Sequence, residues 1–293
     1  MRALKDVAAD NLLLWRENTD QALALRLLQQ QQLGALAGEA WLRDKTPPQP
    51  PTIDQSTPLA RAALVEEQIA FLHGFLATAP DFPARELQEL SPALPAPNAP
   101  RVAFLDSTIG RDALRRFECV LPHHRPRPAP SFTAVCEDIA NERADFALLP
   151  LEDSREGKFL HLYEEIDRFE LHITHVCTVP FAERGRSVLM ALLSHRYTPT
   201  ATAKGDWLLS CTLFGEDASI LSDLLMAANA IGLRLHHIDT LPSPYGEDGA
   251  FYHPVFCTES TAQDALLLSY LTVCLPRAHV TARYLHLKEE NHD

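Results

Sequence analysis

Positive charge is scarce in this sequence of 293 residues, which has 26 Lys and Arg against 39 Asp and Glu and a net charge of −13. Because nucleic-acid binding depends on neutralising phosphates, this balance argues against nucleic acid as the main partner. It argues against an anionic membrane surface for the same reason. The sequence also lacks any run approaching the roughly 20 apolar residues of a membrane helix, so no membrane partner is expected.

Cysteine pairs and an export signal are also missing. Residues 1–10 contain two aspartates and no unbroken apolar core, and the six cysteines form no C-x-x-C pair. We therefore expect a cytoplasmic protein with reduced, mostly buried thiols. His172 and His175 are three residues apart in an expected strand, which places their rings on opposite faces. Without a matching Cys or carboxylate pair, neither a metal site nor a cofactor is predicted.

Proline divides the first hundred residues. It is absent from residues 1–45, where apolar residues recur at helical spacing, and this pattern predicts one or two long helices. Four prolines in residues 46–52 end them. Thr57 and Pro58 are typical of an N-cap followed by proline at the first helical position. Six prolines in residues 80–100 predict a linker, so the helical module spans residues 1–79.

The remaining sequence predicts a multi-domain α/β protein. From residue 101 to about 200, short apolar strands alternate with helices, which favours a layered sheet. Residues 205–290 contain strands near 207–214, 234–240, 251–258 and 279–286 with two helices between them. The resulting order βαββαβ is ferredoxin-like.

Residues 144–157 resemble the prephenate dehydratase fingerprint, approximately A-D-x-x-x-x-P-I-E-N-S-x-x-G, and residues 131–135 resemble the S/T-F-x-x-V helix that precedes it. These dehydratases carry a C-terminal ACT regulatory domain of βαββαβ topology, and bifunctional members begin with an all-helical chorismate mutase. The order of the three modules therefore resembles the bifunctional chorismate mutase/prephenate dehydratase family. The resemblance implies a role in L-phenylalanine biosynthesis.

The resemblance also implies dehydratase residues in the fingerprint and at the family's Thr-Arg-Phe motif: Glu152, Ser154, Arg186 and Ser187. Gly185 stands at the Thr position, Asp153 replaces the fingerprint Asn, and most or all of the family's second lobe has no counterpart. The central domain is thus expected to be shortened and its catalytic motif eroded. Two alternatives stay open here. Glu152 and Ser154 contact a ligand or cap the following helix, and Arg186 is catalytic or a carboxylate partner.

For the other two modules the resemblance implies ligand-binding residues. Chorismate would be held by Arg16, Arg43 and Lys45, with Gln68 near the ether oxygen, although Gln29–Gln32 occupy a stretch where the family places further arginines. The phenylalanine motifs of the ACT domain correspond to Ala218, Ser219, Ile220 and Asp239. Asp217 and Leu241 depart from those motifs.

These observations lead to the expectation of a protein of aromatic amino-acid metabolism with eroded catalytic motifs. One alternative is a working prephenate dehydratase (a lyase) or chorismate mutase (an isomerase). The others are a non-catalytic ACT-type regulator that binds an aromatic ligand, and a structural partner of a complete enzyme. The expected ligand is prephenate, chorismate or phenylalanine. The expected assembly is a homodimer through the ACT-like domain and the N-terminal helices.

Overall fold

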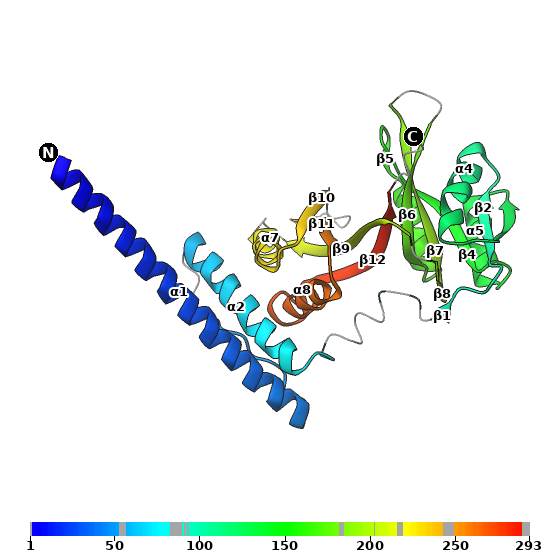
Figure 1. The fold of residues 1–293 in the computed structure, drawn as a ribbon. Helices are drawn as coiled ribbons and strands as arrows, with labels where there is room; N and C mark the ends of the chain where they lie inside the picture. The colour runs from blue at the N-terminus through cyan, green and yellow to red at the C-terminus, as the bar shows by residue number, and fades with distance from the viewer. Residues whose placement is uncertain are drawn as a thin grey trace.

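The computed structural model describes residues 2–52, 57–82, 90, 92, 94–181, 185–201, 203–215, 219–242 and 249–288, without the side chains of residues 2–15, 58, 241 and 242. It is an α/β fold with an N-terminal helical module, as the sequence predicts (Figure 1). Helices α1 (Arg2–Asp44) and α2 (Pro58–Thr78) make up this module. Thr57 caps α2, because its Oγ1 accepts a hydrogen bond from the Ala60 amide at 3.2 Å.

Helices α1 and α2 run parallel to each other. Arg26 pairs with Glu67, and Trp41, further along α1, packs edge-on against Phe75, further along α2. The segment that follows α1 returns along α2, where the Gln68 side chain donates to the Pro51 carbonyl at 3.1 Å. A parallel pair was not predicted, since apolar spacing along each helix carries no information about their relative direction.

The two helices approach closely where Gly34 faces α2. A Cβ at Gly34 would overlap the carbonyl oxygen of Phe71. Gly34→Ala is therefore expected to push the helices apart and lower the free energy of unfolding by about 1–3 kcal/mol. Thermal unfolding followed by circular dichroism measures this loss. Gln32→Ala, on the exposed side of the same helix, is the control; equal losses in the two variants would contradict the packing argument.

The central domain alternates strands and helices. In chain order it contains β2 (Arg101–Leu105), α4 (Thr108–Arg116), the 3-10 turn η1 (Phe117–Cys119), β3 (Arg125–Ala129), α5 (Phe132–Ala140), β4 (Phe146–Asp153), β5 (Gly157–Lys158), α6 (Leu160–Arg168), β6 (His172–Pro180) and β7 (Ser187–Ser194). Strand β2 lies parallel between β3 and β4, and β7 is antiparallel to both β4 and β6. Helix α4 covers one face of this sheet, and α5 and α6 cover the other.

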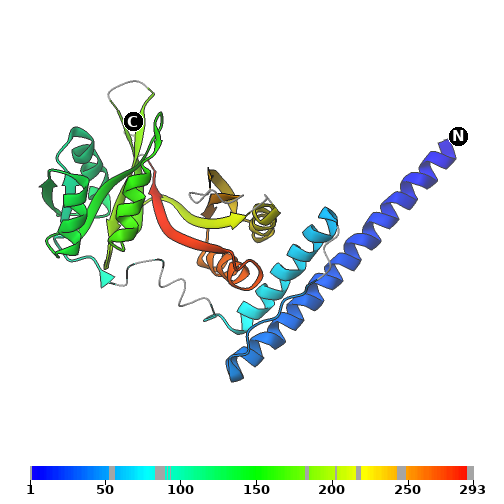
Figure 2. The same ribbon diagram turned by 180° about the vertical axis from the view of Figure 1, so that it is seen from behind.

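The C-terminal domain has the predicted βαββαβ order: β9 (Gly205–Gly215), α7 (Ser219–Ile231), β10 (Arg234–Pro242), β11 (Ala250–Thr258), α8 (Thr261–Cys274) and β12 (Ala278–Leu287). Its strands lie antiparallel in the order β10-β11-β9-β12, which is the ferredoxin-like arrangement. Helices α7 and α8 share a core with Phe71 and Leu72 of α2. The helical module thus packs on α7 and α8 (Figure 2).

The two sheets join into one. Strand β12 pairs in parallel with β6, with Leu285 opposite His175 and His286 opposite Val176, so a single ten-stranded sheet runs through both domains. Part of the predicted linker also has regular structure: β1 (Leu94–Pro95) pairs with β8 (Tyr197–Thr198), which follows β7. The junction of β6 and β12 brings the fingerprint end of β4 near strands of the ferredoxin-like domain.

Candidate functional site

The fingerprint ends in a tight β-hairpin. Strand β4 stops at Asp153, and β5 starts at Gly157, whose φ of +83° favours glycine. The buried Asp153 accepts hydrogen bonds at Oδ1 from the amides of Arg155 (2.9 Å) and Glu156 (3.3 Å), as in an Asx turn. These amides, Arg155 first, lower the pKa of Asp153, and the Arg186 guanidinium adds to the effect.

The hypothesis that Glu152 and Ser154 cap a following helix is wrong. A turn and β5 follow these residues, because the Asx turn of Asp153 reverses the chain direction there. The Ser154 hydroxyl instead accepts a hydrogen bond from the Ser187 amide at 2.9 Å, and the Ser154 amide donates to the Ser187 carbonyl at 2.9 Å. The four residues implied for dehydration therefore do lie together, at the adjoining ends of β4 and β7.

Arg186 is held by carboxylates. Its Nε donates to Asp153 Oδ2 and its Nη2 donates to Glu156 Oε1, each at 2.8 Å. Its guanidinium also stacks over the Phe181 ring, 4.6 Å from the centroid. Of the two roles left open by the sequence, this geometry matches the carboxylate partner. Asp153, at the fingerprint Asn position, supplies the buried half of that pair, with a side chain only 1% exposed.

Next to these residues, a pocket of about 380 Å³ lies between the two domains. The central domain contributes Glu152, Ser154 and Ser187 to its lining. The ferredoxin-like domain contributes a second set from β10 and β12: His236, His237, Asp239, Tyr284 and His286. None of the described residues that line it is Arg or Lys. We call this cavity the interdomain pocket.

Asp239 links the domains at the interdomain pocket. Its Oδ2 lies 2.5 Å from Lys158 Nζ of β5 and 3.3 Å from His237 Nε2. The Nδ1 atoms of His236 and His237 are 2.7 Å apart, so one of them donates and the other accepts. Burial is the main reason that the pKa values of His237 and His286 fall below the usual value, which leaves both rings neutral at pH 7. The pocket therefore offers carboxylates, neutral imidazoles and hydroxyls.

The residues that the resemblance implies for effector binding do not all lie at the interdomain pocket. Ser219 and Ile220 start α7, and Ile220 packs against the core that α2 and α7 share. Ala218 and Asp217 lie outside the described residues. Among the described members of the set, Asp239 is the one that lines the interdomain pocket, as Glu152 also does. The sequence around β10 did not predict that Asp239 and Glu152 line the same pocket, because their proximity depends on the pairing of β6 with β12.

The residues implied for chorismate binding lie apart. Arg16 and Arg43 are both exposed on α1, and 27 residues of one helix separate them by about 40 Å. Lys45 lies over the Trp41 ring, 3.7 Å from its centroid, and Gln68 bonds the Pro51 carbonyl. Within one chain these four side chains therefore do not converge on a single ligand.

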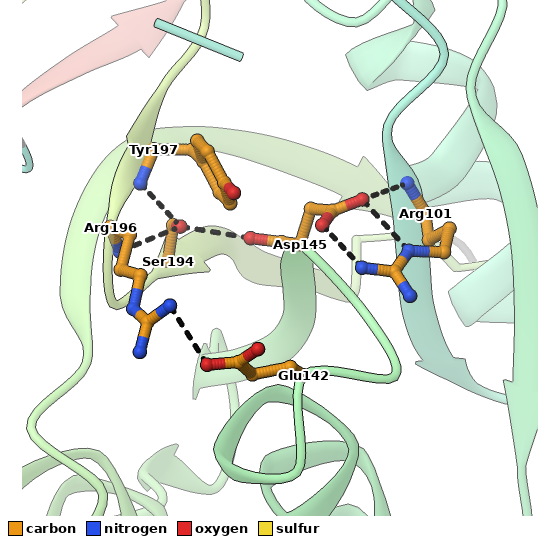
Figure 3. Close-up of polar contacts among 6 residues, drawn as sticks. All are labelled: Arg101, Glu142, Asp145, Ser194, Arg196 and Tyr197. Carbon is orange, nitrogen blue, oxygen red and sulfur yellow. Dashed lines mark hydrogen bonds and ion pairs between the residues drawn. The ribbon is translucent and has the colours of Figure 1, made fainter. Parts of the chain in front are cut away.

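A second cavity, of about 360 Å³, opens at the opposite end of β4. Six of its lining residues form the polar cluster in Figure 3: Arg101, Glu142, Asp145, Ser194, Arg196 and Tyr197. We call it the edge cavity. The sequence did not predict it, because its residues come from four separate stretches of the chain and no local spacing pattern relates them.

The described residues contain no group of three or more His, Cys, Asp or Glu side chains able to hold a metal ion. None of the described helices combines the length and apolar character needed to cross a membrane. The six cysteines are all free, and four of them are buried.

Comparison with known proteins supports the fold. No protein-family model matches the sequence. No curated protein matches it either. Among solved structures, prephenate dehydratase from Streptococcus mutans superposes with a TM-score of 0.54 at 18% identity, covering 65% of this chain and 100% of that one. The chain therefore has a fold similar to that of a prephenate dehydratase.

Two further structures are more distant. Prephenate dehydratase from Arthrobacter aurescens, solved in complex with L-Phe, has a TM-score of 0.46 at 12% identity and covers 63% of this chain and 90% of that one. GqqA, described as a novel type of quorum quenching acylase, has a TM-score of 0.46 at 14% identity and covers 63% of this chain and 94% of that one.

Proposed function

We propose that this chain is a non-catalytic, ligand-binding relative of the bifunctional chorismate mutase/prephenate dehydratases, with an eroded dehydratase site and an ACT-like regulatory domain. The observation that carries the proposal is the state of Arg186. Its Nε and Nη2 donate to the carboxylates of Asp153 and Glu156, so the positive charge that would attract a substrate carboxylate is already balanced by two acids of the protein.

The lining of the interdomain pocket supports the same conclusion. Prephenate and chorismate each carry two carboxylates. Glu152 would repel them, Asp239 is already paired with Lys158, and the described lining of the pocket has no Arg or Lys. Phenylalanine carries one carboxylate and an ammonium group, and its ammonium can pair with Glu152. Its ring would pack on Tyr284, Leu189 and Leu208, which also line the pocket. Of the three candidate ligands, the pocket therefore favours phenylalanine.

Two assays test this function. Purified protein mixed with chorismate, and separately with prephenate, is expected to form no prephenate or phenylpyruvate at concentrations where a family enzyme is easily detected. L-Phenylalanine is expected to raise the thermal midpoint, since a ligand that binds only the folded state stabilises it by about 2.7 kcal/mol at 100 times its Kd. Turnover of either substrate would disprove the proposal that the chain is non-catalytic.

The matched variant for the binding assay is Glu152→Gln. It keeps the size of the side chain and removes the charge that would pair with the ligand ammonium, so it is expected to abolish most of the shift caused by L-phenylalanine. Glu118→Gln, on the 3-10 turn η1 away from the pocket lining, is the control and should retain the full shift. An undiminished response of Glu152→Gln would exclude the interdomain pocket as the phenylalanine site.

We also propose a homodimer through α1. Its 43 residues extend about 65 Å and the 21 residues of α2 about 32 Å, so α1 reaches well past α2 (Figure 1). Its leucines are exposed by 45–67% of their area at Leu25, Leu28, Leu33, Leu36 and Leu42. A second copy of α1 would cover this apolar side. Light scattering is expected to give twice the 32.7 kDa chain mass, and Leu25→Lys with Leu28→Lys should give the monomer.

A further inference from the structure

The edge cavity is built around a buried serine. The Ser194 hydroxyl donates to the Asp145 carbonyl at 2.8 Å and accepts from the amides of Arg196 (3.3 Å) and Tyr197 (3.0 Å) (Figure 3). Ser194 is fully buried. Because these bonds fix the turn after β7, they hold Arg196 and Tyr197 at the cavity wall.

Arg101, one of the arginines that line the cavity, forms an ion pair with the buried Asp145. The backbone amide and Nε of Arg101 donate to Asp145 Oδ2 at 2.7 and 3.1 Å, and its Nη2 donates to Asp145 Oδ1 at 2.7 Å. Burial alone would raise the pKa of Asp145, but the hydrogen bonds and charge of Arg101 outweigh burial and lower it. Both carboxylate oxygens of Asp145 are therefore used, and they hold Arg101 in place at the cavity wall.

The second arginine has a weak and exposed partner. Arg196 Nη1 lies 2.8 Å from Glu142 Oε1, with side chains 52% and 67% exposed. Exposed ion pairs of this kind contribute about 0–1 kcal/mol. Glu142 also carries a φ of +56°, a left-handed conformation that costs a non-glycine residue stability. Here it follows the end of α5, where glycine is the usual residue.

The charge balance changes when Glu142 leaves. With Glu142 in place, three arginines and three acids line the cavity: Arg101, Arg168 and Arg196 against Glu142, Asp145 and Glu170. Without it the lining has one more cation than acid. The remaining wall includes the rings of Tyr197 and Phe169 and the apolar Ile139, which suit a flat apolar body.

We propose that the edge cavity is a binding site for a small monocarboxylate with a planar apolar body, and that the ligand carboxylate displaces Glu142 from Arg196. The ligand then bonds the guanidinium of Arg196, while its body lies against Tyr197 and Phe169. This site is separate from the interdomain pocket, since the two cavities lie at opposite ends of β4. The Glu142 carboxylate occupies the arginine in the absence of ligand.

Calorimetric titration of the full chain with sodium benzoate tests the site, with uncharged benzamide and inorganic phosphate as comparison probes. Benzoate is expected to bind and benzamide is not. Glu142→Gly should tighten benzoate binding severalfold, because it removes the competing carboxylate, and glycine suits the positive φ of this position. Arg196→Gln should weaken it at least tenfold, while Arg115→Gln, which alters an exposed pair with Asp112, should leave it unchanged.

Each other outcome overturns the proposal. Absence of benzoate binding, equal binding of benzamide, or stronger binding of phosphate would exclude a monocarboxylate site. Unchanged or weaker binding by Glu142→Gly would exclude displacement of Glu142. Circular dichroism of both variants, whose substitutions are at exposed side chains, establishes that they are folded. The response to L-phenylalanine should persist in Arg196→Gln, so failure of this site and failure of the interdomain pocket are told apart.

Discussion

Replacing Arg283 with methionine is expected to lower the free energy of unfolding by about 3–5 kcal/mol, the usual cost of leaving a buried charge without its partner. Arg283 Nε donates to Asp264 Oδ2 at 2.7 Å, and the Asp264 side chain is completely buried. The other oxygen, Oδ1, has no hydrogen-bond partner among the described residues. The Arg283 guanidinium also lies over the Trp207 ring, 4.0 Å from its centroid. Methionine keeps only the apolar stem, so the loss measures the guanidinium with both of its contacts.

Urea unfolding followed by circular dichroism measures this effect. Arg115→Met, which breaks the exposed pair with Asp112, is the matched control and should cost at most about 1 kcal/mol. Adding Asp264→Leu to Arg283→Met should recover much of the stability, because the double variant buries no unpaired charge. If Arg283→Met cost no more than Arg115→Met, the buried pair would not be a major stabilising contact.

Acid is expected to destabilise the fold through His175 between about pH 6.5 and pH 4. Burial lowers the pKa of His175 to about 4, and its Nδ1 has no hydrogen-bond partner in the described part of the chain. The unfolded chain takes up the proton near pH 6.5, whereas the folded chain does so only near pH 4. The stability attached to this group is therefore complete above pH 6.5 and falls by about 3 kcal/mol on acidification through that window.

His175→Leu is expected to remove this part of the pH dependence. The variant should gain stability over the natural chain as the pH falls from 7 to 4.5, measured as the difference between their urea midpoints at each pH. Several other histidines shift in the same direction by burial, among them His172 and His253, and the difference between the two proteins cancels their contribution. His73→Leu, at an exposed position on α2, should run parallel to the natural chain; a parallel course for His175→Leu would contradict the assignment.

Both predictions concern residues near the pairing of β6 with β12 in the joined sheet. His175 faces Leu285 at the pairing of β6 with β12, and Arg283 lies two residues earlier on β12. Loss of a contact at either residue therefore destabilises the structure near the junction of β6 and β12, which shapes the interdomain pocket. A ligand bound in that pocket is expected to offset part of either loss, because it stabilises only the folded chain.

Local features of the sequence were sufficient to predict the elements. Thr57 before Pro58 acts as an N-cap, as expected. The strands expected near 207–214, 251–258 and 279–286 lie in β9, β11 and β12. The order βαββαβ also follows once each strand and helix is predicted from its own stretch of sequence. Each of these features depends on residues within a few positions of one another, so the sequence contains the information without any knowledge of distant contacts.

The tertiary structure decided what those elements bring together. It made α1 and α2 parallel, joined β12 to β6, and placed Asp239 beside Glu152 in one pocket. It also gave Arg186 two carboxylate partners and gathered Arg101 and Arg196 around a cavity that no motif marked. Such contacts depend on which edges and faces pack together across the whole chain. Spacing along the sequence therefore determined the modules of this protein, and packing between distant segments determined its two candidate sites.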